Sequence, residues 1–155
     1  MITAAQYFGA KINSPECTPQ ILYNADKLLL AVNGLLDEAR NLGVYFDAVD
    51  ADTGICISGA KGGSGDGGFR LSTSTTGSAR STHRSARGVD VYDPNSRLDD
   101  WLTTLDSAGG ARNTMLEKHG LYRESPDFTV GGIPANDWCH LQDLAPGSGR
   151  RTYNP

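Results

Sequence analysis

Three residues of the sequence have the types that hold a catalytic divalent metal ion. They are two histidines, His83 and His140, and one aspartate, Asp90, which follows His83 by seven positions. A catalytic zinc ion takes three such ligands and leaves one position open for water. Two neutral imidazoles and one carboxylate keep the site positive, which lowers the pKa of that water from roughly 15.7 to about 7. On spacing alone, the alternative is a loop histidine, a capping aspartate and a hydrogen-bonded strand histidine.

Seven positions separate His83 and Asp90, which is too far for both side chains to reach one metal ion from the same helix. This separation suits a loop histidine followed by a turn and a short strand at 88–92. On such a strand Asp90 points to one face and the two flanking valines point to the other. A buried carboxylate is costly without a partner. A neighbouring strand at 137–142 would bring His140 to it.

A long segment rich in glycine, serine and threonine, at 59–81, precedes the first of these residues. Its composition is typical of a linker, but a long loop inside a small domain is more often functional. Between positions 61 and 88, five Lys or Arg residues stand against one Asp, which gives a local charge of +4 in a chain of net charge −4. This local excess favours an anionic substrate.

Several regular elements are expected to support this region. A helix should begin after Thr18, with Pro19 in its first turn, and end near Gly43, because apolar residues recur between them at helical spacing. The other expected elements are strands at 44–49, 54–58, 88–92, 121–124 and 137–142, and helices at 96–105 and 111–119. These elements predict an α+β fold, with a small antiparallel sheet and helices packed on one side, in a single domain over 1–155.

Length, charge and composition exclude some classes of protein. A chain of 155 residues suits one domain with a real core. The mild acidic excess argues against nucleic-acid binding, and no run approaches the roughly 20 apolar residues of a membrane span. The first residues lack a basic start followed by an apolar core, so no signal peptide is expected. Three cysteines without a CxxC pair indicate reduced thiols.

Three short motifs, Ser81-Thr82-His83, Asp90 and Trp138-Cys139-His140, occur in this order along the chain. In them the chain resembles the M15 family of zinc peptidases, which contains D-Ala-D-Ala carboxypeptidases and phage endolysins. Ala86 and Gly88 stand where the family has glycine and alanine, so its small residues are present but shifted. Further similarity covers nearly the whole chain, at 24–36, 57–59, 120–126 and 146–155. The resemblance implies a hedgehog/D-Ala-D-Ala peptidase-like fold.

The resemblance also implies the ligands and the general base. His83, Asp90 and His140 would hold Zn²⁺. Glu124 would take a proton from the zinc-activated water and pass it to the leaving amine. Asp137, three residues before the last histidine, is the alternative base.

Other residues would contact the substrate or support the ligands. Arg70 would grip a substrate carboxylate, because Lys61 stands where the family has arginine. Ser81 would support the first histidine or hydrogen-bond the reacting carbonyl, and Trp138 would form a wall of the pocket. Asp93 and backbone carbonyls are candidate acceptors for the outward imidazole N–H groups.

The function implied by the resemblance is zinc-dependent hydrolysis of a peptide bond in peptidoglycan stem peptides. The enzyme would be an endolysin-like endopeptidase or a D,D-carboxypeptidase, expected as a monomer. It would be phage- or prophage-encoded, made in the host cytoplasm, and would act on the cell wall. The alternative is a non-catalytic cell-wall-binding or virion structural module that retains the zinc fold.

Overall fold

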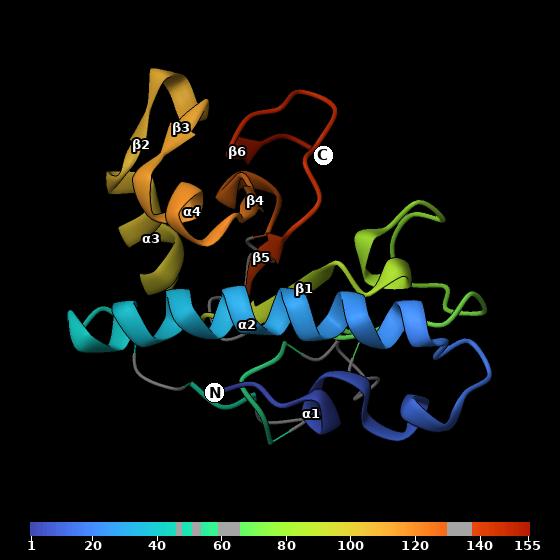
Figure 1. Ribbon diagram of the computed structural model, residues 1–155. Coiled ribbons are helices and arrows are strands. Elements are labelled where there is room, and N and C mark those ends of the chain that lie inside the picture. Colours follow the sequence, from blue (N-terminus) through green and yellow to red (C-terminus); the bar gives the residue numbers. More distant parts are fainter. Residues whose placement is uncertain (46–47, 51–53, 59–65, 130–137) are drawn as a thin grey trace.

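The computed structural model describes residues 1–45, 48–50, 54–58, 66–129 and 138–155. The chain begins with helical elements, and strands and short helices follow, which together form an α+β arrangement (Figure 1). In chain order the elements are α1 (Ala4–Phe8), η1 (Gly9–Asn13), α2 (Pro19–Asn41), η2 (Thr82–Ser85), β1 (Gly88–Tyr92), α3 (Arg97–Thr104), β2 (Asp106–Ser107), η3 (Ala108–Gly110), β3 (Arg112–Asn113), α4 (Thr114–His119), β4 (Tyr122–Glu124), η4 (Pro126–Phe128), β5 (Trp138–Gln142) and β6 (Thr152–Tyr153).

The long helix α2 forms as its sequence predicts. The Thr18 side chain accepts a hydrogen bond from the backbone N–H of Ile21, and Pro19 occupies the first turn. The helix α2 crosses the molecule in front of β1 (Figure 1). One face of α2 is buried and consists of Ala25, Leu28, Leu29, Val32, Leu35, Leu36 and Ala39. Gly43 has φ +69°, a conformation that glycine adopts at little cost after a helix end. Within the described residues, no helix is both long and apolar enough to cross a membrane.

The main sheet has the strand order β1-β5-β4-β6. The β1–β5 and β5–β4 pairs are antiparallel, but β4 and β6 are parallel. The sheet is therefore mixed, and the expectation of an antiparallel sheet is wrong at this edge. The reason is that β6, where no strand was expected, pairs its backbone with the edge of β4. Two residues carry no side-chain alternation that could have predicted this strand.

The expected strands at 44–49 and 54–58 are not regular strands where the structure describes them. In the second segment, Ile57 forms an isolated bridge to β1. The next donor along β1, the backbone N–H of Asp90, bonds instead to the carbonyl of Gly67 at 2.8 Å. Because Gly67 occupies this ladder position, the 54–58 segment cannot extend its pairing with β1.

The two helices expected at 96–105 and 111–119 are present but shorter than predicted. They are α3 and α4, and the small β2–β3 sheet lies between them. Asn113 explains where α4 begins, because its side chain accepts hydrogen bonds from the backbone N–H groups of Met115 and Leu116. Because these two N–H groups bond to the Asn113 side chain, they do not bond to carbonyl groups of an earlier helical turn, and α4 begins after Asn113.

Candidate metal centre

Asp90 and His140 face each other across two central strands. The register of β1 and β5 pairs them directly, and Val89 and Val91 are fully buried on the other face of β1. The backbone N–H and C=O of Asp90 bond to Gly67 and Ser58, on the side away from β5. Asp90 and His140 are therefore a non-hydrogen-bonded pair, the kind in which opposing side chains lie closest.

His83 reaches the same place from the short helix η2. The Ser81 side chain accepts a hydrogen bond from the backbone N–H of His83, and Ala86, with φ +55°, ends the helix in a left-handed turn. Gly88 is required after this turn, because a Cβ there would lie 2.2 Å from the Thr82 hydroxyl oxygen. The predicted turn and short strand are confirmed, but His83 lies in the short helix η2 rather than in a loop.

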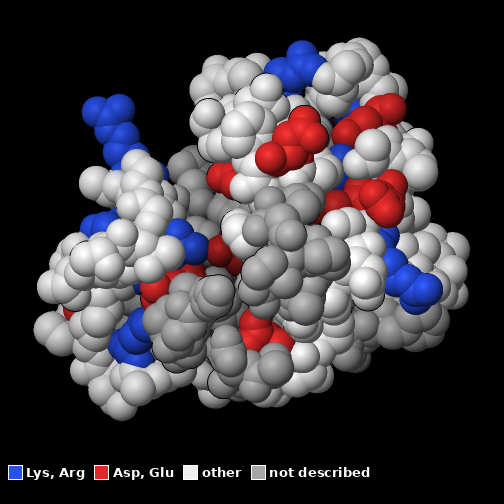
Figure 2. Space-filling view, turned by 180° about the vertical axis from the view of Figure 1, so that it is seen from behind, with Lys and Arg blue, Asp and Glu red and all other residues white. Residues whose placement is uncertain are grey.

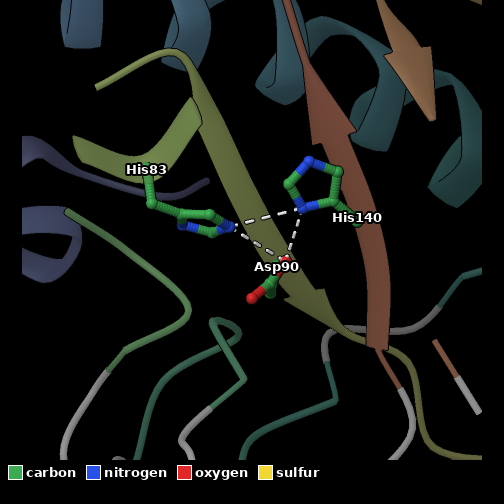
Figure 3. Close-up of side chains that lie close together, drawn as sticks. All are labelled: His83, Asp90 and His140. Atoms are coloured by element: carbon green, nitrogen blue, oxygen red, sulfur yellow. Dashed lines mark hydrogen bonds and ion pairs between the residues drawn. The ribbon is translucent and has the colours of Figure 1, made fainter. Parts of the chain in front are cut away.

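The three side chains converge on one point (Figure 3). His140 Nδ1 lies 2.7 Å from Asp90 Oδ1, His83 Nε2 lies 3.2 Å from the same oxygen, and the two nitrogens are 3.3 Å apart. All three residues are buried, and their ligand atoms lie within 4.8 Å of one another. Two imidazole nitrogens and a carboxylate oxygen in this arrangement can hold a divalent metal ion.

The outward nitrogens of both imidazoles have partners of their own. His83 Nδ1 lies 2.8 Å from the carbonyl oxygen of Gly68, and His140 Nε2 lies 3.3 Å from Gln142 Oε1. A carbonyl oxygen can only accept, so the proton of a neutral His83 lies on Nδ1 and its Nε2 lone pair faces the cluster. Such outer partners are typical of metal-binding histidines, and the chemistry of the donor set fits a metal ion.

Burial and mutual charge shift the pKa values of all three groups. Burial opposes ionisation of Asp90, but the two histidines hold the pKa of this carboxyl well below its ordinary value. Burial also disfavours the charged form of His140, yet the hydrogen bond and charge of Asp90 raise the pKa of His140. For His83, burial prevails over the attraction of Asp90 and lowers the pKa. Asp90 is thus an ionised carboxylate beside two histidines of unequal basicity.

Arg70 contacts the cluster directly. Its Nη2 lies 2.8 Å from Asp90 Oδ2, and its Nε donates to the carbonyl oxygen of Asp66 at 2.6 Å. The guanidinium therefore occupies one oxygen of Asp90 and leaves Oδ1 facing the histidines. The sequence suggested a substrate contact for Arg70 but gave no sign of this ion pair, because the partners are 20 positions apart.

A cavity of about 540 Å³ opens beside the cluster. The predicted base Glu124 and the predicted substrate residues Arg70, Ser81 and Trp138 all line it. Figure 2, seen from behind, shows basic and acidic side chains next to one another around a hollow. The negative charge of Glu124 also contributes to the raised pKa of Tyr153, whose largest cause is burial.

The remaining predictions have mixed outcomes. Asp137 and Lys61 lie outside the described residues. Asp93 is not an outer partner of either ligand histidine, and that expectation is wrong. Its carboxylate instead caps α3 by accepting the backbone N–H groups of Leu98 and Asp99, and burial raises its pKa to about 6.

Three supporting residues escaped the sequence analysis. Gln142 could have been found, because residues two apart on a strand share a face and His140 is two positions before it. Gly68 and Tyr153 gave no such signal. Gly68 acts through its backbone carbonyl, and Tyr153 lies on the unpredicted strand β6.

A Gly68→Ala variant should disturb both the fold and the position of His83 in the cluster. A Cβ at Gly68 would lie 2.1 Å from the backbone oxygen of Tyr7. The segment must move, at about 1–3 kcal/mol of unfolding free energy, and the carbonyl that accepts from His83 moves with it. Denaturant unfolding and zinc titration measure the two effects. Gly147→Ala, where a Cβ meets nothing within 4 Å, is the control. Equal zinc affinity in both variants would contradict the role given to the Gly68 carbonyl.

Comparisons with protein-family models, with curated proteins and with solved structures found no match for this chain. The geometry itself gives a buried cluster of two histidines and one aspartate beside a cavity. Each imidazole has a partner on the nitrogen that faces away from the cluster. A divalent metal ion fits this cluster, with the cavity providing access for a second molecule.

Proposed function

We propose that this chain is a zinc peptidase that hydrolyses a peptide bond in bacterial peptidoglycan stem peptides. The ligands would be His83, Asp90 and His140. The observation that carries the proposal is the convergence of their three ligand atoms within 4.8 Å, beside a cavity. The resemblance of these motifs to the M15 peptidases supports it, and leaves two forms of the reaction, endopeptidase and D,D-carboxypeptidase.

The chemistry divides between the metal and the chain. A zinc ion on three protein ligands supplies Lewis-acid activation of water and of the scissile carbonyl. Glu124, at the end of β4, lines the same cavity. It would accept a proton from the attacking water and deliver it to the leaving amine, which requires hydrogen-bond reach of roughly 2.6–3.2 Å during the reaction. Trp138 would form one wall of the substrate site, and Ser81 another.

Basic residues around the cavity would recognise the carboxylates of a stem peptide. Arg70 lines the cavity but already bonds to Asp66 and Asp90. Arg80 also lines it, and no ion pair is found for its side chain among the described residues. Guanidinium groups bind carboxylates in a two-pronged geometry. We propose that these two arginines together orient the substrate.

Removal of the metal should abolish the activity. Dialysis against a chelator is expected to stop release of muropeptides from purified cell walls, and addition of zinc is expected to restore it. Mass spectrometry of the released fragments identifies the bond that is cut. A chain incubated with magnesium in place of zinc is the control, because Mg²⁺ prefers oxygen ligands. Hydrolysis that persists without metal would reject the proposal.

A second candidate is a non-catalytic module that binds the cell wall or belongs to a virion. The ion pair of Arg70 with Asp90 favours this second candidate. The guanidinium is bound to the cluster, whereas in an enzyme it would contact the substrate. In both candidates we propose a phage or prophage origin, synthesis in the host cytoplasm and a monomeric chain. Wall binding without hydrolysis by the zinc-loaded parent chain would favour the module.

A further inference from the structure

We propose that Gln142 and Tyr153 are positioning residues that hold a proton on Nε2 of His140 and so turn its Nδ1 toward the metal. The inference rests on the proposed zinc site. It concerns a chain of hydrogen bonds that leads from the ligand His140 through Gln142 to Tyr153, near the C-terminal end of the described chain. Gln142 contacts His140 only at Nε2, the nitrogen that faces away from the cluster, and Tyr153 acts through Gln142.

The orientation of the Gln142 amide follows from its surroundings. Its Nε2 donates to the backbone carbonyl of Leu144. A carbonyl oxygen can only accept, so the amide cannot turn over without placing two oxygens against each other. Its Oε1 must therefore face His140 Nε2, at 3.3 Å. An amide oxygen also only accepts, so His140 Nε2 must carry the hydrogen.

Tyr153 strengthens this arrangement from a separate strand. Its hydroxyl donates to Gln142 Oε1 at 2.6 Å, and the residue is 8% exposed. The two lone pairs of Oε1 are then both used, one by Tyr153 and one by His140. The parallel pairing of β6 with β4 brings Tyr153 to this position, opposite Glu124. A segment distant in sequence thus takes part in holding a metal ligand.

The two histidine ligands are held in different ways. His83 donates to the backbone carbonyl of Gly68, which no substitution at that site can remove. His140 depends on the side chain of Gln142. Since outer partners of this kind change metal affinity by about 10- to 100-fold, Gln142 is the place where such an effect can be measured without touching a ligand.

The experiment compares Gln142→Met and Tyr153→Phe with the parent chain. Methionine keeps the length of the side chain and removes the acceptor, so zinc should bind about 10- to 100-fold more weakly, as measured by competition with a chelating dye. Tyr153→Phe removes one hydrogen bond to Gln142, and a loss of about three- to tenfold is expected. Tyr45→Phe is the matched control. It also removes a buried hydroxyl bond, 2.8 Å to the carbonyl of Tyr92, and Tyr45 is not among the residues that line the cavity beside the cluster.

A second readout needs no metal. In ¹H–¹⁵N spectra of the metal-free parent, His140 should show a slowly exchanging proton on Nε2, which should exchange much faster in Gln142→Met and stay protected in Tyr45→Phe. A proton found on Nδ1 alone, or unchanged protection in Gln142→Met, would overturn the inference. Equal zinc affinity in the parent and Gln142→Met would also overturn it. Failure of the parent chain to bind zinc would instead reject the proposed function, while the proton measurement still decides how His140 is held.

Discussion

A Glu124→Gln variant should keep its zinc and its fold but hydrolyse peptidoglycan peptides about 100- to 10,000-fold more slowly than the parent chain. Glutamine has nearly the same shape as glutamate but cannot accept the proton of the attacking water. Glu124 lines the cavity and is not among the three residues of the cluster. Zinc content, thermal unfolding and the initial rate of muropeptide release are the measurements.

The matched control is Glu117→Gln, an acidic residue on α4 that pairs with Arg112 and does not line the cavity. It should hydrolyse at the parent rate. A Glu124→Gln variant that is as active as the parent would remove Glu124 from the mechanism and leave Asp137 as the base to test. Wall binding that survives in Glu124→Gln while hydrolysis is lost separates the enzyme from the non-catalytic module.

An Arg123→Ala variant should lose about 3–5 kcal/mol of unfolding free energy. Arg123 has no exposed surface and connects three parts of the fold. Its Nη1 bonds to Asp99 at 2.9 Å, its Nη2 to Asp106 at 2.9 Å, and its Nε to the Thr152 hydroxyl at 3.1 Å. Removal of the guanidinium leaves two acidic groups without the cation that compensates their burial. Denaturant unfolding at pH 7 measures the loss.

The deficit of Arg123→Ala should shrink as the pH falls toward about 4. Burial already raises the pKa of Asp99 despite the neighbouring guanidinium, and removal of Arg123 raises it further. A carboxyl whose pKa is raised by folding stabilises the fold most below its unfolded pKa of about 3.9, and this contribution is lost as pH rises through the folded pKa. The difference in unfolding free energy between the variant and the parent therefore becomes smaller at acidic pH. A deficit that is constant from pH 7 to 4 would contradict this account, and Arg112→Ala, at a surface ion pair, is the control expected to stay near the parent midpoint.

Features that depend on local sequence were predictable. The apolar spacing and the Thr18-Pro19 start determined α2, because a helix is built from contacts three and four residues apart. The alternation around Asp90 determined which face of β1 it takes, and the same rule places Trp138 and His140 together on β5. The three residues of the cluster were proposed because a buried aspartate between two valines needs a partner, and because the motifs that contain them resemble those of a known peptidase family.

The features that only the tertiary structure decided depend on partners distant in the sequence. The ion pair of Arg70 with Asp90 and the bond of Tyr153 to Gln142 join side chains that no local pattern relates. The carbonyl of Gly68 that holds His83 carries no side-chain signature at all. The sequence by itself therefore determined which residues could hold a metal ion. The tertiary structure decided how each ligand is held, because hydrogen bonds to backbone carbonyls and between separate strands exist only once the chain has brought them together.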